Sequence, residues 1–286
     1  KETSITDDYD YNLYDINIEK IKIAFRGFYS IFDKIAYFLN EYFMTDKIYS
    51  DAKIAELYDL CNTWGDDNDF YLSLAIGSEK LKILDLGCGT GILSHAFAEK
   101  GYTVVGCDPA LAMLEIARKN DKNKKVEWVL SGAQEYKSTT LFDLIIMTGH
   151  TFQVFLTDED VLAVFRVVKK CLSKNGLFVF ETRNPHIDWI RRWSDSTKNI
   201  QCPSGETVIM STDSVKQDDN KILFSHHYTF LNESIESKST LLFLSSTQIK
   251  DLLNREGLRV IEEYGNWDSS PISDQSPEII FKVIHQ

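Results

Sequence analysis

The sequence predicts an α/β protein built on a doubly wound, mostly parallel sheet of seven strands. Three observations carry this prediction. From residue 81 onward, short apolar strands alternate with amphipathic helices, as in parallel sheets that are covered on both faces. A glycine-rich loop, Gly87–Gly91, follows the first strand and precedes a helix. The chain has 286 residues, of which 43% are hydrophobic, so it can build the core that such a sheet needs.

Strands and helices alternate through the predicted core, residues 80–185. Each predicted strand is a short apolar run, and each predicted helix places apolar side chains on one face. Gly101 stops the first helix, and Pro109 opens the second. The predicted strands are 82–86, 102–107, 126–130, 142–147 and 176–181, and the predicted helices include 92–100 and 157–172.

The pattern changes after Pro185. The region 186–245 holds three alternating, β-rich segments joined by polar turns, which predicts a three-stranded antiparallel insertion that forms the substrate region. The last region, 246–286, predicts a helix that Ser246 or Thr247 caps, followed by two strands. These segments are 206–215, 221–231 and 236–244 for the insertion, 247–256 for the helix, and 258–261 and 279–284 for the last strands.

The first 43 residues differ in composition from the rest of the chain. They hold 11 Phe and Tyr side chains, and apolar residues recur at steps of three and four, which predicts one long helix with an apolar stripe. Such a helix cannot stand alone in water, so we expect it to pack on the main domain, on a second copy of the chain in a homodimer through residues 18–43, or on a missing partner. The run Ala24–Ala36 resembles one helix of HEPN-type domains, so this segment is either a native extension or a fused fragment.

A new polar stretch at Met44 marks the predicted start of the main domain, 44–286, whose first part, 44–79, we expect to be a helical cap. The formal net charge of −12 would repel a nucleic-acid backbone, so a nucleic-acid partner is not expected. Five scattered cysteines predict reduced thiols and a cytoplasmic protein. Neither these cysteines nor the histidines have a metal-ligand spacing, and His226 and His227 should point to opposite faces of a strand. No apolar run is long enough to span a membrane.

The glycine loop indicates which kind of cofactor the core would bind. Glycines let the backbone approach a ligand closely, and the helix that follows presents free N–H groups. Dinucleotide enzymes use a G-x-G-x-x-G spacing, whereas this loop has G-x-G-x-G and is preceded by Asp85. A carboxylate there repels phosphate but attracts an ammonium or sulfonium group. A second acid, Asp108, ends the second strand, where it can accept hydrogen bonds from ribose hydroxyls.

The stretch Ile83–Gly91 strongly resembles motif I of class I S-adenosylmethionine-dependent methyltransferases, and the resemblance continues through Val105–Pro109, Phe142–Ile146 and Asn175–Phe180. It implies a Rossmann-like methyltransferase fold, S-adenosylmethionine as cofactor, S-adenosylhomocysteine as product, and a bacterial small-molecule enzyme of the sugar N- or glycine-type group. The cofactor-binding residues that it implies are Asp85, Gly87, Cys88, Gly89, Gly91, Asp108, Pro109, Met113, Ala133, Gln134 and Thr148.

One position departs from that family pattern. The family often has Gly-Asp after the third strand, with the Asp reaching the adenine amino group. Here the residues are Gly132-Ala133-Gln134, so that contact would have to come from Gln134 or from backbone.

The candidate catalytic residues are His150 and Tyr58. His150 lies in the loop after the fourth strand, where it is either a general base, a substrate orienter or a histidine that bonds only to backbone. The resemblance to the cap of small-molecule methyltransferases implies that Tyr58 reaches the sulfonium or the acceptor; the alternative is core packing. Trp64 would close the pocket or pack. Arg183 would pair with a substrate carboxylate or with an acidic neighbour.

These features favour a methyltransferase that moves a methyl group to an N or O atom of a small molecule by in-line displacement. A nicotinamide oxidoreductase does not fit the glycine spacing or Asp85. A cofactor-binding protein without turnover and an RNA methyltransferase remain as alternatives, although the charge of −12 disfavours the second.

Overall fold

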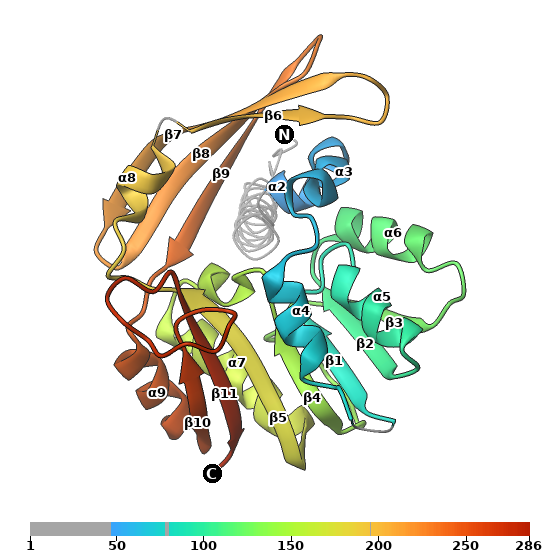
Figure 1. Ribbon diagram of the computed structural model, residues 1–286, viewed down its shortest axis with the longest axis vertical. Helices are drawn as coiled ribbons and strands as arrows, with labels where there is room; N and C mark the ends of the chain where they lie inside the picture. The colour runs from blue at the N-terminus through green and yellow to red at the C-terminus, as the bar shows by residue number, and fades with distance from the viewer. Residues whose placement is uncertain (1–46, 78–79, 195) are drawn as a thin grey trace, which may run out of the picture. The chain divides into compact units, whose positions relative to one another are not determined.

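The computed structural model describes residues 47–77, 80–194 and 196–286. The predicted helix over 18–43, with its proposed dimer contact, lies outside the described residues. The chain divides into two units, residues 1–45 and 46–286. All elements described below belong to the second unit (Figure 1).

A seven-stranded sheet forms the centre of this unit, in the order β10-β11-β5-β4-β1-β2-β3 (Figure 1). The strands from β5 to β3 run parallel, and β11 runs antiparallel to both of its neighbours. The predicted sheet is therefore confirmed. Its strands are β1 (Lys82–Leu86), β2 (Thr103–Asp108), β3 (Val126–Leu130), β4 (Phe142–Met147), β5 (Leu172–Arg183), β10 (Leu258–Tyr264) and β11 (Glu278–His285).

Helices cover both faces of this sheet, because successive side chains of its buried strands point to opposite sides. On β4, Ile145 and Met147 join one apolar core with α7 and α9. Leu144 and Ile146 join a second core with α4 and α5. The helices of this domain are α4 (Asp66–Ser73), α5 (Ile92–Glu99), α6 (Leu111–Asn120), α7 (Asp158–Cys171) and α9 (Ser246–Arg255).

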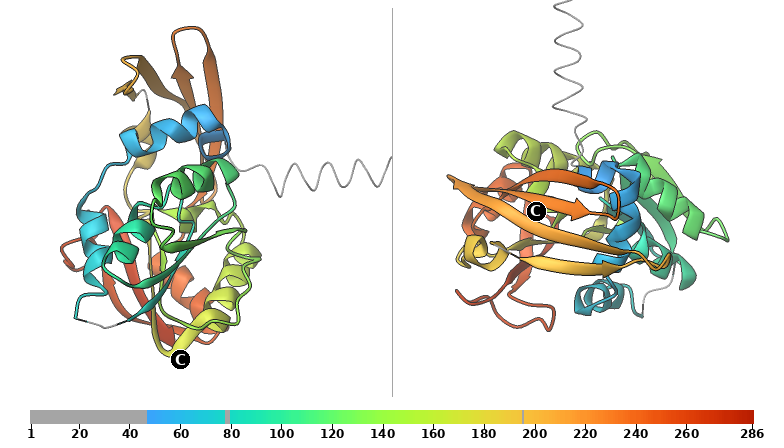
Figure 2. Two further views of the ribbon diagram at one scale, coloured as in Figure 1. Left: turned by 90° about the vertical axis from the view of Figure 1, so that its right-hand side faces the viewer. Right: turned by 90° about the horizontal axis from the view of Figure 1, so that it is seen from above.

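A second, antiparallel sheet stands over the carboxyl ends of the parallel strands (Figures 1 and 2). It has four strands, not the three that the sequence predicted, because Thr197–Gln201 adds an edge strand. That segment escaped prediction because Ile200 is its one buried residue, so it shows no apolar alternation. The strands are β6 (Thr197–Gln201), β7 (Thr207–Asp218), β8 (Lys221–Thr229) and β9 (Ser234–Leu242).

The cap consists of short helices, and one of them links the two sheets. Its first two helices are α2 (Lys47–Ser50) and α3 (Ala52–Cys61). Two further short elements lie outside the cap, namely η1 (Thr151–Val154) after β4 and α8 (Trp189–Trp193) after β5. One side of α3, with Ile54 and Leu57, packs on the insertion sheet at Val208. Another side, with Ala55, packs on Met113 of α6. The helix α3 is therefore held between the insertion and the main domain (Figure 2).

Two local predictions can be compared with the structure. The N-cap of α9 is Ser245, not Ser246 or Thr247, because Ser245 and Gln248 form a reciprocal capping box. His226 bonds to Thr212 and His227 pairs with Asp213, so the two histidines do lie on opposite faces of the insertion sheet. Within the described ranges, the structure has no helix that is both long and apolar enough to cross a membrane.

Candidate active site

The glycine loop between β1 and α5 has a conformation that only glycine adopts easily. Gly87 has a φ of 78° and Gly89 a φ of 54°, both in the left-handed region. A Cβ atom at Gly87 would lie 2.5 Å from the Cγ2 atom of Thr151, so a larger residue would clash there. At Gly89 it would meet only the Tyr58 ring, at 4.0 Å. The loop therefore presents bare backbone beneath Tyr58, where β1 and β4 meet and the strand order reverses.

Two buried carboxylates flank this loop. Asp85 of β1 accepts a hydrogen bond from the Ser94 hydroxyl at 2.7 Å through Oδ2, while its buried Oδ1 has no hydrogen-bond partner among the described residues. Burial raises the pKa of Asp85 to about 7. The hydrogen bond from Ser94 lowers this pKa, and the nearby negative charge of Asp108 raises it. An unpartnered acceptor in a buried position fits a cationic ligand group.

Asp108, the last residue of β2, is fixed by the backbone. Its Oδ2 accepts from the Gly89 N–H at 2.9 Å, and its Oδ1 accepts from the Ala110 N–H at 2.8 Å. Burial raises the pKa of Asp108, and these two hydrogen bonds oppose that rise. Each oxygen keeps a second lone pair for a ligand hydroxyl, as the predicted ribose contact requires.

The helix α3 places Tyr58 over the loop. The neighbouring Asp59 accepts a hydrogen bond from the Thr90 hydroxyl, which ties α3 to the loop. Burial, and then the negative charge of Asp108, raise the pKa of Tyr58 to about 12. Tyr58 is therefore a neutral phenol at ordinary pH and can donate a hydrogen bond.

The remaining predicted cofactor residues differ in their burial and contacts. Met113 is fully buried and packs with Ala110 beneath Ala55 of α3. Ala133 is buried in the main core, and Gln134 beside it is half-buried. Pro109 is exposed, Cys88 is buried with a raised thiol pKa, and the Thr148 carbonyl accepts hydrogen bonds from Thr151.

His150 lies at the end of β4 and is held at two points. It has a left-handed φ of 59°, and its backbone N–H donates to Glu181 at 2.7 Å. Its ring Nε2 lies 2.8 Å from a carboxylate oxygen of Glu278. Glu181 also accepts from the Tyr71 hydroxyl of α4. The alternative that His150 bonds only to backbone is therefore wrong, because its ring bonds to a carboxylate.

Arg183, the last residue of β5, carries a largely buried guanidinium. It donates to the Gln153 side chain at 2.9 Å and lies over the rings of Trp189 and Trp193, 5.7 and 5.1 Å from their centroids. No ion pair joins it to an acidic side chain of the described residues, although Glu278 and Glu181 act on it at longer range. Its unused N–H donors can therefore bind an anionic group.

Trp64 differs from these residues. It lies in the segment that connects α3 and α4, is 43% exposed, and its indole N–H donates to Asp69 at 2.8 Å. Its predicted role in closing the pocket stays a prediction.

Sequence reasoning missed Glu181, Glu278 and Gln153. A buried acid in an otherwise apolar strand, such as Glu181 after Phe178–Phe180, was the available signal, since unpaired acids are rarely buried. Glu278 and Gln153 gave no such signal, because only the fold brings them beside His150 and Arg183.

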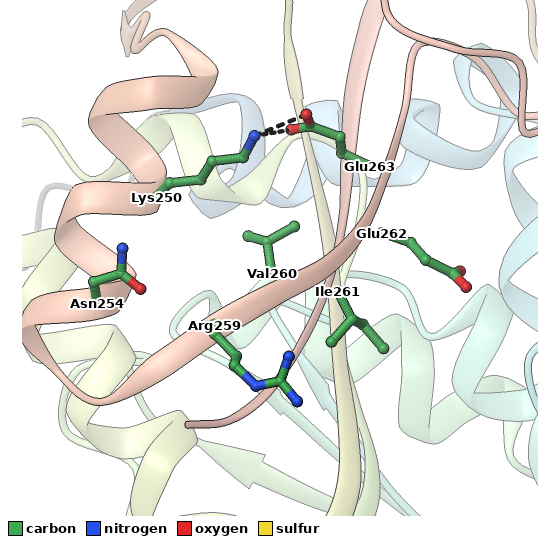
Figure 3. A pocket seen from close by; sticks show the side chains of 7 residues that line it. All are labelled: Lys250, Asn254, Arg259, Val260, Ile261, Glu262 and Glu263. Carbon is green, nitrogen blue, oxygen red and sulfur yellow. Dashed lines mark hydrogen bonds and ion pairs between the residues drawn. The ribbon is translucent and has the colours of Figure 1, made fainter.

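A separate cavity of about 350 Å³ lies between α9 and the edge strand β10 (Figure 3). Lys250 and Glu263 form an ion pair, 2.7 Å long, in its wall. This cavity contains none of the residues described above, so it is not part of the candidate site.

Comparisons with known proteins agree with this geometry. Residues 83–176 match the family described as "Methyltransferase domain", and residues 1–65 match the LA2681-like HEPN family. The cypemycin N-terminal methyltransferase of a Streptomyces species is 26% identical over 208 residues, which cover 71% of this chain and 83% of that protein. A ubiquinone biosynthesis O-methyltransferase of Cereibacter sphaeroides is 33% identical, but the match covers only 53% of its length.

Solved structures show the same fold. An S-adenosylmethionine-dependent methyltransferase from Clostridium acetobutylicum superposes with a TM-score of 0.68 at 15% identity, covering 82% of this chain and 98% of that one. The S-adenosylmethionine-bound amino pentose methyltransferase CalS10 from Micromonospora echinaspora gives 0.61 at 16%, covering 79% and 94%. The predicted HEPN resemblance at the N-terminus is confirmed by the family match. The predicted resemblance of the main domain is confirmed as well: residues 83–176 match a methyltransferase domain, and the fold around them is that of S-adenosylmethionine-dependent methyltransferases.

Proposed function

We propose that this protein transfers a methyl group from S-adenosylmethionine to a nitrogen atom of a small molecule that carries an acidic group. The observation that carries the cofactor assignment is the buried Oδ1 of Asp85, at the switch point of the sheet, which has no hydrogen-bond partner in the part of the chain that the structure describes. An ammonium group would satisfy that oxygen, whereas a pyrophosphate would be repelled by it.

Several side chains would divide the cofactor among them. Asp85 and the backbone of Gly87 and Gly89 would hold the methionine part, and Asp108 would hold the ribose. The adenine would lie near Met113 and Gln134. When bound, the cofactor supplies an electrophilic methyl group on a positively charged sulfur. The protein then has to exclude water, orient the acceptor and remove a proton from it.

The acceptor side of the site supports an amine with an acidic group. Arg183 offers unpaired N–H donors to an anion, and Glu181 and Glu278 favour a positive charge beside it. Two of the similar proteins, the cypemycin N-terminal methyltransferase and the sugar N-methyltransferase KedS8 from a Streptoalloteichus species, are named for N-terminal methylation and for sugar N-methylation. Both names point to nitrogen acceptors, which is why we favour nitrogen over oxygen here.

Calorimetric titration tests the cofactor assignment. We expect S-adenosylmethionine and S-adenosylhomocysteine to bind and NAD not to bind. Asp108→Ala should weaken binding by at least about tenfold, which is about 1.4 kcal/mol. Glu115→Gln, an exposed carboxylate on α6, serves as the matched control and should bind as the wild type does. Binding of NAD alone would overturn the proposal.

Release of S-adenosylhomocysteine tests turnover and the acceptor class. We expect release with members of a panel of amino acids and amino sugar acids, and much less with the corresponding amines that lack an acidic group. Arg183→Lys keeps the charge but loses the planar donor fork, so it should raise KM more than it lowers kcat.

The same panel separates the alternatives. Cofactor binding without turnover on any member would indicate a binding protein, and turnover on transfer RNA alone would indicate an RNA methyltransferase.

The five free thiols fit a reducing compartment, so we place this function in the cytoplasm.

A further inference from the structure

Three charged side chains gather on one face of the seven-stranded sheet, beside His150. Glu181 and Arg183 are two positions apart on β5, so they point to the same side. Glu278 of β11 lies directly opposite Arg183 in the strand register. Tyr71 of α4, which covers this face, reaches Glu181. The cluster is buried: the exposed fraction is 1% for Glu181 and 8% for Glu278.

This cluster fixes both the backbone and the ring of His150. Glu181 accepts the backbone N–H at 2.7 Å, which secures the left-handed turn. A carboxylate oxygen of Glu278 lies 2.8 Å from Nε2, at hydrogen-bond distance, and with an ionised carboxylate as the acceptor Nε2 is the ring atom that carries the hydrogen. In the neutral imidazole, Nδ1 is then the ring atom with the free lone pair.

We propose that Glu278 is a positioning residue for methyl transfer: it holds the Nε2–H of His150, so that Nδ1 takes the proton of the acceptor. This inference rests on the proposed function. In the step, an acceptor ammonium gives one proton to Nδ1. Its freed electron pair forms the new N–C bond, the methyl–sulfur bond breaks, and that bond's electron pair remains on sulfur. The proton then leaves from Nδ1 to solvent.

The charges around His150 support this role. Glu278 pairs with the ring at 2.8 Å and Glu181 interacts electrostatically with His150, so both carboxylates stabilise the imidazolium that forms when Nδ1 accepts a proton. Arg183, opposite Glu278 in the strand register, carries the opposing charge. Tyr71 donates a hydrogen bond to Glu181 and also lies within electrostatic reach of Glu278.

A double-mutant cycle on the full chain tests the proposal, with S-adenosylhomocysteine release from the best acceptor of the panel as the readout. Glu278→Gln keeps the size and a hydrogen-bond acceptor but removes the charge. We expect kcat to fall roughly 10- to 100-fold, a larger effect than the rise in KM that follows from losing one negative charge beside the acceptor. The acid limb of the pH profile should move to lower pH, because a neutral amide stabilises the imidazolium less than a carboxylate does.

His150→Asn is the second variant, because asparagine tolerates the left-handed conformation of this residue. If Glu278 acts through His150, the double variant will be no slower than His150→Asn alone. The matched control is Glu263→Gln. Glu263 is a carboxylate of β10 that pairs with Lys250 of α9, and its substitution should leave kcat unchanged.

Two results would overturn the inference. Additive losses in the double variant would show that Glu278 does not act through His150. An unchanged pH profile in Glu278→Gln, with a loss of thermal stability only, would show a structural role. Absence of turnover by the wild type with every acceptor refutes the proposed function itself, and the inference with it, and is recognised before any variant is made.

Discussion

The Asp85 carboxylate has opposite effects on folding and on ligand binding. Burial raises its pKa to about 7, well above the value near 3.9 that an unfolded chain would give. The folded protein therefore binds this proton more tightly than the unfolded chain does. Its contribution to stability is favourable below about pH 4 and is lost as the pH rises through about 7. The same ionisation creates the anion that a cationic cofactor group needs.

Asp85→Asn separates these two effects. Asparagine stays neutral and can still accept from Ser94, so we expect the unliganded variant to be more stable than the wild type at pH 8 by roughly 1–3 kcal/mol. The difference should shrink toward pH 5. Binding of S-adenosylmethionine at pH 8 should weaken by at least about tenfold. Thermal unfolding at several pH values and calorimetry measure both. Equal unfolding free energies of the wild type and Asp85→Asn at pH 8 would contradict the conclusion that burying the ionised Asp85 destabilises the folded protein.

At the scale of elements, apolar patterning and glycine spacing were sufficient for most of the main sheet. Four predicted strands agree with β1 to β4 to within one residue, because buried parallel strands are continuous apolar runs. The edge strand β6 was missed because its first three residues are exposed and polar. Its pairing with β7 comes from tertiary context, which a local pattern does not contain.

The residues of the candidate site also differ in whether a local sequence pattern could predict them. Asp85, Asp108 and the glycines follow one another closely along the chain, so their spacing alone predicted them. Glu278 and His150 are 128 positions apart, and only the order of β11, β5 and β4 brings them together. Residues joined by such long-range pairing carry no local signal.

The helix α3 joins the insertion sheet to the cofactor loop, which gives Leu57 a testable role. Leu57 is 4% exposed and packs with Val208 and Tyr228 of the insertion. Leu57→Ala should cost about 2–4 kcal/mol in unfolding free energy, since it leaves a cavity in that cluster. The next residue, Tyr58, covers the loop, so cofactor affinity should fall as well. Chemical denaturation and calorimetry measure the two effects. Glu56→Ala, an exposed neighbour on the same helix, is the control.

At the scale of the whole molecule, the HEPN match extends into the structural unit that contains the methyltransferase match. The HEPN match covers residues 1–65 and so includes α2 and α3. Yet Asp59 of α3 bonds to Thr90 of the glycine loop, within the methyltransferase match. The described part of the HEPN match therefore serves as the cap of the candidate active site. A boundary at Met44 keeps this cap, whereas a boundary at residue 65 removes it.

Two truncated chains test this division. A chain of residues 44–286 keeps α3 and should bind S-adenosylmethionine within about threefold of the full chain, less than about 0.7 kcal/mol. A chain of residues 66–286 exposes Met113 and Val208, which pack against α3, and it should lose at least about tenfold in affinity together with thermal stability. Size-exclusion chromatography of the same proteins tests the predicted dimer through residues 18–43: the full chain should elute as a dimer and 44–286 as a monomer. A dimeric 44–286 would place the interface on the main domain, and full affinity in 66–286 would show that α3 contributes nothing to the cofactor site.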